Sequence, residues 1–126
     1  MHNQGIIHAD IKLENILQSE AIVPEELPIS KLCDFGLSHK MNNDGKAFPL
    51  VKCGTLGYMA PELEGQLQLT PANDMWSFGV CLYEMSTAYK PTAVRNYSYS
   101  QGPIPFVQRD WRKRDKNLQD LITQCL

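Results

Sequence analysis

The 126-residue sequence predicts a mainly helical α+β fold that carries one small β-hairpin. Residues 71–87 form an apolar segment long enough for a central helix, and residues 116–126 repeat apolar side chains at helical spacing. Two short runs, at residues 16–17 and 29–33, are apolar or alternate between apolar and polar, as β-strands do. The pattern therefore favours two main helices and one hairpin.

The central helix is expected to begin at Thr70-Pro71. A threonine can accept a hydrogen bond from an N-terminal amide, and proline at the first helical position loses no bond. Apolar side chains cover most of the circumference; they are Met75, Trp76, Phe78, Val80, Cys81, Leu82 and Met85. We therefore predict a helix that is buried nearly all round and forms the central post of the fold.

The last segment has one apolar helical face, formed by Leu118, Leu121, Ile122 and Cys125 at positions i, i+3, i+4 and i+7. The sequence ends there without a capping residue, so we expect a fold that is truncated at this helix. The proline-containing residues 19–29 are predicted to be a long loop inside the hairpin, and Asn42 to Gly45 to be a turn.

Composition excludes several classes of protein. The formal net charge is −2, which argues against a basic nucleic-acid-binding surface, and no apolar run approaches the roughly 18 residues of a membrane span. The start lacks the pattern of a signal peptide, so we expect a cytoplasmic protein, with a nuclear location also open. The four cysteines have no zinc-site spacing and are interpreted as small apolar residues.

Four short motifs carry the chemistry. They are HADIKLEN at residues 8–15, DFG at 34–36, GTLGYMAPE at 54–62 and DMWSFG at 74–79. Phosphoryl transfer needs positioning and charge neutralisation more than covalent chemistry. Asp34 and the side-chain carbonyl of Asn15 can supply the oxygen ligands that Mg²⁺ prefers. Asp10 can accept a hydrogen bond from an attacking hydroxyl, and Lys12 adds positive charge beside the transferred phosphoryl group.

In this order, the four motifs resemble the C-terminal lobe of a eukaryotic protein kinase, and the resemblance covers nearly the whole chain. It implies a partial kinase domain over residues 1–126, with a catalytic loop at 8–15 and an activation segment at 34–62. It also implies a role for each matching residue: Asp10 as catalytic base, Lys12 as phosphate contact, Asn15 and Asp34 as magnesium ligands, Leu17 as the floor under the adenine ring, and Glu14 beside the ribose.

The resemblance assigns further residues to the substrate and to the packing of the lobe. Thr55 falls where the substrate hydroxyl is cradled beside Asp10. Asp74 matches a buried acid that holds the catalytic loop, although an acid near a helix start also favours the helix dipole. His8 and Phe35 match packed residues without a chemical role.

Lys12 and the Gly54-Thr55 pair are similar to serine/threonine kinases. The resemblance thus implies transfer of phosphate from ATP, with Mg²⁺, to serine or threonine of a protein substrate. The basic run at residues 109–116 is interpreted as a solvated approach to the last helix, or alternatively as a docking patch for an acidic partner.

Two departures from the family pattern concern regulation. Ala9 stands where the family usually has an arginine that pairs with a phosphate on the activation segment. Residues 39–54 contain no serine, threonine or tyrosine. We therefore hypothesise that phosphorylation of this segment does not switch the protein on; modification of Ser38 or Thr55 is the alternative.

Other departures concern missing parts. The family's glycine-rich loop, strand lysine and helix glutamate belong to an N-terminal lobe that residues 1–126 lack, so we expect this piece alone to be inactive. The arginine that pairs with the family's counterpart of Glu62 is also absent, so Glu62 is expected to be an unpaired carboxylate near a buried site. A non-catalytic kinase-like interaction or scaffold module is the alternative function.

Overall fold

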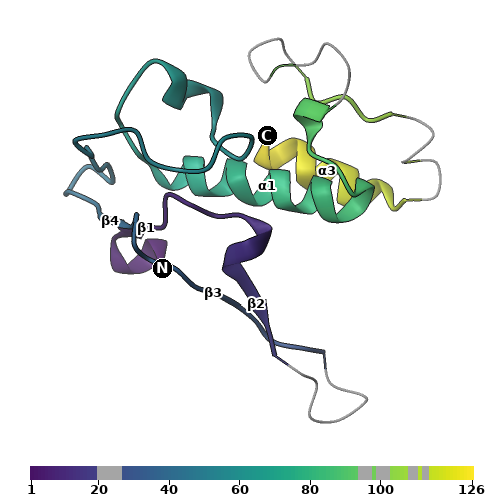
Figure 1. Ribbon diagram of the computed structural model, residues 1–126, viewed down its shortest axis with the longest axis horizontal. Helices are drawn as coiled ribbons and strands as arrows, with labels where there is room; N and C mark the ends of the chain where they lie inside the picture. The colour runs from purple at the N-terminus through teal and green to yellow at the C-terminus, as the bar shows by residue number, and fades with distance from the viewer. Residues whose placement is uncertain (20–26, 94–97, 99–102, 108–110, 112–113) are drawn as a thin grey trace.

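The computed structural model describes residues 1–19, 27–93, 98, 103–107, 111 and 114–126 (Figure 1). Most of the predicted loop inside the hairpin, at residues 20–26, lies outside the described residues, as does much of the basic run at 109–116. Two α-helices pack together, and two small antiparallel sheets lie on one side of them. This arrangement confirms the predicted helical α+β fold.

The central helix α1 spans Pro71–Thr87, the range that the apolar pattern predicts. Thr70 and Asn73 form a capping box at its start, in which the Asn73 side chain accepts a hydrogen bond from the Thr70 amide at 2.6 Å. The prediction of burial nearly all round is wrong. Met75 and Met85 are 43% and 58% exposed, because no described element covers that side of the helix.

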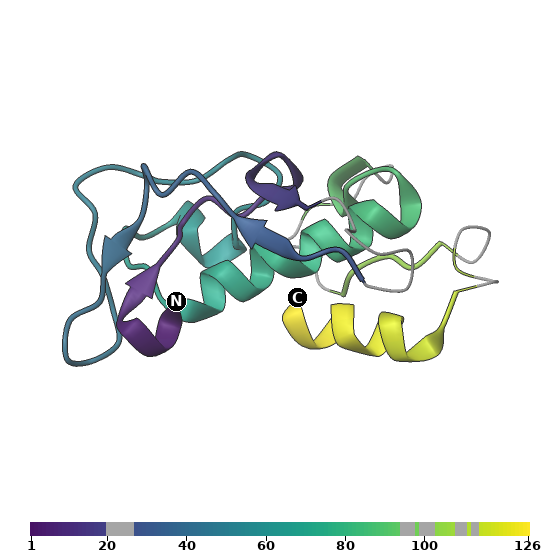
Figure 2. The same cartoon turned by 90° about the horizontal axis from the view of Figure 1, so that it is seen from below.

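The last helix α3 spans Lys116–Cys125 and packs alongside α1 (Figure 2). Asp115 caps it by accepting a hydrogen bond from the Asn117 amide at 2.8 Å. On the predicted apolar face Ile122 is fully buried, whereas Leu121 is 45% exposed. Gly79 of α1 permits the close approach, because a Cβ atom there would lie 2.6 Å from Cβ of Cys125.

The predicted hairpin is present. Strand β2 (Ile16–Gln18) pairs antiparallel with β3 (Ser30–Leu32), with Ile16 opposite Leu32. A second antiparallel pair, β1 (Ile6–Ile7) with β4 (His39–Lys40), was not predicted, because two-residue strands show no alternation. The predicted turn follows β4: Gly45, at φ +73°, donates to the Asn42 carbonyl.

Four short 3₁₀ helices complete the described structure: η1 (His2–Gln4), η2 (Leu13–Asn15), η3 (Pro61–Glu64) and η4 (Pro91–Ala93). None of the described helices has the length and apolar character needed to cross a membrane.

Three apolar clusters form the core around α1. One joins β1 to the segment before α1 and consists of Ile7, Ala47, Leu63 and Leu69. The second packs Ile11 on α1 together with Tyr58, Val80 and Cys81, and the third joins α1 to α3 through Tyr83, Trp111 and Ile122. All four cysteines are free thiols, and burial raises the pKa of Cys81 to about 12, so it behaves as an apolar residue.

Candidate active site

The candidate site is built on a hydrogen-bonded contact between residues 8–9 and the first turn of α1. The Asp74 carboxylate, 1% exposed, accepts the backbone amides of His8 at 2.8 Å and Ala9 at 2.9 Å. It also contacts Nε2 of His2 at 2.8 Å. Ala9 takes the left-handed conformation, at φ +66°, so the chain turns directly after the two bonded amides and leads to Asp10. Asp74 therefore does more than favour the helix dipole, since it fixes the path of the loop.

His8 joins the loop to the residues around Asp34. Its buried ring contacts the Cys33 carbonyl through Nε2 at 3.0 Å and the Asp10 amide through Nδ1 at 3.3 Å. These partners require a proton on Nε2 and a lone pair on Nδ1. The His8 ring also contacts the ring of Phe35, and the two ring centroids lie 4.8 Å apart. The predicted packing of Phe35 is only partly correct, because the residue is 51% exposed although its ring contacts His8.

Asp10, Lys12, Asn15 and Thr55 meet at one point. Lys12 Nζ lies 2.9 Å from Asp10 Oδ2, and the Thr55 hydroxyl donates to Asp10 Oδ1 at 2.5 Å. Lys12 Nζ also donates to the Thr55 hydroxyl oxygen at 3.0 Å, which closes a triangle. The Asn15 amide nitrogen donates to both the backbone carbonyl and Oδ2 of Asp10, at 2.9 and 3.2 Å. Three donors thus orient one carboxylate.

This arrangement changes the acidity of both charged partners. Burial raises the pKa of Asp10, but the hydrogen bonds from Thr55, Lys12 and Asn15 and the charge of Lys12 together outweigh it, so the pKa lies below its usual value. The hydrogen bond to Asp10 raises the pKa of Lys12, and the nearby carboxylates of Glu14 and Asp34 raise it further. The pair therefore stays ionised at neutral pH.

Asn15 and Asp34 have the donor chemistry that a magnesium ion requires. Both hydrogen bonds of the Asn15 side chain use its nitrogen, so its carbonyl oxygen has no hydrogen bond among the described residues. Asp34 is exposed, and its Oδ1 accepts only the Gly36 amide at 3.2 Å within that part of the chain. The two neighbours of Asp34, Cys33 and Phe35, both contact the His8 ring, and these contacts hold Asp34 beside residues 8–15. Two oxygen ligands fit Mg²⁺, which keeps several water or phosphate ligands.

The residues implied to contact the nucleotide lie on the outside. Glu14 is exposed, and Leu17 on β2 has 56% of its surface exposed. An exposed apolar side chain on a strand is compatible with a ligand-facing surface, but the roles of both residues stay predictions.

The expectation for Glu62 is wrong. Its side chain is exposed, and Oε1 accepts a hydrogen bond from Nδ2 of Asn73 at 2.6 Å. The missed partner, Asn73, lies three positions after the capping residue Thr70, which is the capping-box position. That spacing was the available signal, although it could not show that the other end of the amide reaches Glu62.

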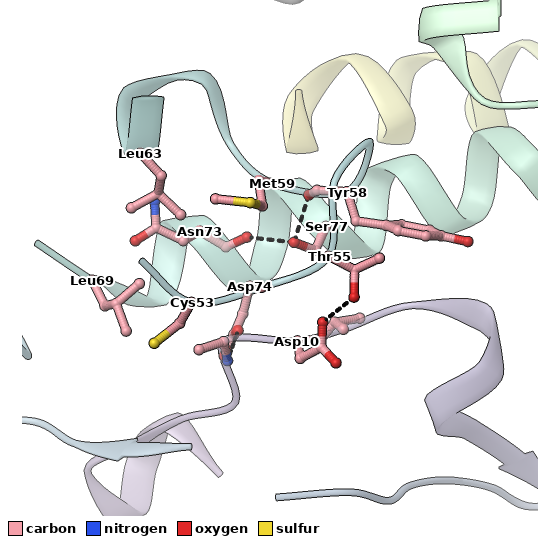
Figure 3. A pocket seen from close by; sticks show the side chains of 13 residues that line it. Asp10, Cys53, Thr55, Tyr58, Met59, Leu63, Leu69, Asn73, Asp74 and Ser77 are labelled. Carbon is pink, nitrogen blue, oxygen red and sulfur yellow. Dashed lines mark hydrogen bonds between the residues drawn. The ribbon is translucent and has the colours of Figure 1, made fainter. Parts of the chain in front are cut away.

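Figure 3 shows the segment that carries Asp10 and the segment that carries Thr55 meeting beside α1. A cavity of about 10 Å³, roughly the size of one water molecule, is lined by residues 9–11, by residues 53–55 with Tyr58, Met59, Leu63 and Leu69, and by Asn73, Asp74 and Ser77 of α1. Asp10 and Thr55 point toward each other at its edge. The two segments are thus packed closely against each other and against α1.

Comparison with known proteins identifies relatives of the whole chain. The family model described as "Protein kinase domain" matches residues 1–126. Calcium/calmodulin-dependent protein kinase type 1 of Macrobrachium nipponense is 35% identical over 131 residues, which cover all of this chain and 36% of that protein.

Two further relatives are named as kinases of other groups. MAP kinase-interacting serine/threonine-protein kinase 2 of Xenopus laevis is 32% identical over 157 residues, covering all of this chain and 33% of that protein. Ribosomal protein S6 kinase alpha-6 of Danio rerio is 44% identical over 92 residues, which are 72% of this chain and 11% of that protein. The chain therefore spans about a third or less of the length of these relatives.

The hydrogen bond from Thr55 predicts an acidity change. In Thr55→Val the Asp10 carboxylate loses one donor, so its pKa should rise, as followed by a carbon NMR titration of the carboxyl group. A depressed pKa stabilises the folded state above the unfolded pKa, and this contribution disappears as pH falls through the folded pKa. The variant should therefore lose less stability on acidification.

Ser38→Ala is the matched control, because the Ser38 hydroxyl donates to the His8 carbonyl and does not bond Asp10. An Asp10 pKa that is the same in Thr55→Val and in the parent protein would contradict the assignment.

Proposed function

This chain belongs to the protein kinase family, and on that premise we propose that it carries the catalytic residues of a serine/threonine protein kinase, which transfers the terminal phosphoryl group of ATP to a hydroxyl of a protein. The observation that supports this most directly is the convergence of Lys12, Asn15 and Thr55 on the Asp10 carboxylate.

The hydrogen bonds of Asp10 leave room for a substrate. A carboxylate has about four lone-pair positions, and the donors from Thr55, Lys12 and Asn15 occupy three of them. The remaining position accepts the hydroxyl of the substrate, orients its oxygen for attack and takes its proton, as the new bond to phosphorus forms and the bond from that phosphorus to the bridging oxygen breaks to release ADP. Because the pKa of Asp10 is low, orientation is its larger contribution.

Lys12 and the two proposed metal ligands handle the charge of the phosphates. The Lys12 ammonium lies between Asp10 and Thr55, where it can donate to an oxygen of the group in transfer. Asn15 and Asp34 would hold Mg²⁺, which when bound neutralises negative charge on the phosphates.

The preference for serine and threonine is proposed from Lys12 and Thr55. Both residues contact the site around Asp10, and both are residue types that are similar to those of serine/threonine kinases at these positions. One relative carries the words serine/threonine-protein kinase in its name, which agrees with this substrate class.

Regulation follows from the contacts of residues 39–54. β4 pairs with β1, the Asn42 side chain accepts the amides of Asp44 and Lys46, and Ala47 exchanges two backbone hydrogen bonds with Leu69. None of these contacts involves a side-chain hydroxyl that could be phosphorylated. We therefore propose that the segment keeps its position without phosphorylation.

Asp10→Asn in the complete protein tests the catalytic proposal against the non-catalytic alternative. The amide cannot accept the proton, so the turnover of a serine-containing peptide should fall by about 10²–10⁴-fold, measured by transfer of labelled phosphate. Asp44→Asn, in an exposed turn, is the control and should retain activity. Absence of turnover in the unmodified protein, with ATP and Mg²⁺ present, would favour the interaction module.

Treatment with a phosphatase tests the proposed regulation. Mass spectrometry first shows that residues 34–62 of the treated protein carry no phosphate. The activity of the complete protein should then equal its activity before treatment, because backbone pairing holds the segment. A large loss of activity that returns when Ser38 or Thr55 is phosphorylated again would refute the proposal.

A further inference from the structure

Three side chains on one face of α1 hold the segment that carries Thr55. Asn73 donates to Glu62 at 2.6 Å, the Ser77 hydroxyl donates to the Tyr58 carbonyl at 2.8 Å, and Glu84 accepts the Tyr58 hydroxyl at 2.5 Å. Steps of four and seven residues place the three side chains on one side of a helix. Figure 3 shows Asn73 and Ser77 pointing to the same side as Met59 and Leu63. Residues 58–62 are therefore attached to the helix at both ends.

These attachments extend to the chemical centre. The Tyr58 amide donates to the Thr55 carbonyl at 3.1 Å, which closes a turn between the two residues. The Thr55 hydroxyl in turn donates to Asp10. A shift of residues 58–62 relative to α1 would thus move Thr55, whereas Asp74 on the same helix keeps residues 8–9 in place.

Asn73 differs from its neighbours because both ends of its amide are used. Oδ1 accepts the Thr70 amide at 2.6 Å and so caps α1, while Nδ2 donates to Glu62. The side chain is 3% exposed. A carboxylate at this position could cap the helix but could not donate to Glu62. The residue type is therefore suited to a second task besides capping.

We propose that Asn73 is a positioning residue for peptide phosphorylation: through Glu62 it sets residues 58–62, and with them Thr55, relative to Asp10. The inference rests on the proposed kinase function, because Thr55 and Asp10 are the groups that receive the substrate hydroxyl. In this proposal the Glu62 carboxylate is held by the Asn73 side chain of α1.

Asn73→Asp in the complete protein separates the two tasks of this side chain. The new carboxylate still caps the Thr70 amide and places a second negative charge against Glu62. The KM for a serine peptide should rise about tenfold or more, as expected for losing a hydrogen bond to a charged group, while the KM for ATP stays unchanged. A cap-only role predicts no change, because acids are good capping residues.

The double variant Asn73→Asp with Glu62→Gln restores the contact in reverse, since the glutamine amide now donates to the aspartate. Its peptide KM should return close to that of the parent protein. Asn117→Asp, the same substitution in the first turn of α3 and at an exposed position, is the matched control and should change nothing.

Glu62→Ala provides a variant that removes an exposed side chain and so should fold if Asn73→Asp does not. Hydrogen exchange of the amides of residues 58–63 gives a readout without turnover: exchange should be faster in Glu62→Ala and Asn73→Asp, and should return to the parent rate in the double variant. Parent-like exchange and peptide KM in Glu62→Ala, or a double variant as defective as Asn73→Asp, would overturn the inference. If the parent protein phosphorylates no peptide, the proposed function fails, whereas the exchange rates still decide the role of Asn73.

Discussion

The buried carboxylate of Asp74 is the constraint on which the rest of the site depends. A carboxylate that is 1% exposed is stable only if donors replace water, and the amides of His8 and Ala9 do so. Directly after these two amides the chain turns at Ala9, which takes the left-handed conformation, and this costs about 1–2 kcal/mol for a residue other than glycine. The charge-assisted hydrogen bonds from His8 and Ala9 to Asp74 hold the backbone immediately before this turn.

The helix that carries Asp74 also carries the second half of the site. Asp10 and Thr55 are 45 residues apart in sequence, so local secondary structure alone cannot bring them into contact. They meet because residues 8–9 are bonded to Asp74, whereas residues 58–62 are bonded to Asn73 and Ser77 of the same helix. Helix α1 thus fixes the positions of residues 8–9 and residues 58–62 relative to each other. The lowered pKa of Asp10 reflects the contact with Thr55 that results.

Local chemistry made much of this predictable. Thr70-Pro71 gave the start of α1, and the order of the motifs indicated which residues would gather around Asp10. The Asn73–Glu62 bond and the exposure of Met75 were not predictable, since the first depends on a side chain's direction and the second on what covers a helix face. The β1–β4 pair was too short to leave a pattern.

The most direct test of the central constraint is hydrogen exchange at the His8 and Ala9 amides, by NMR, in the parent protein and in Asp74→Asn. The asparagine can present an oxygen to only one of the two donors and turns an N–H toward the other. Exchange of at least one amide should therefore accelerate about tenfold or more, because a hydrogen bond to a charged group contributes roughly 1.5–3 kcal/mol. Equal protection of both amides in the two proteins would show that the loop is held by something other than Asp74.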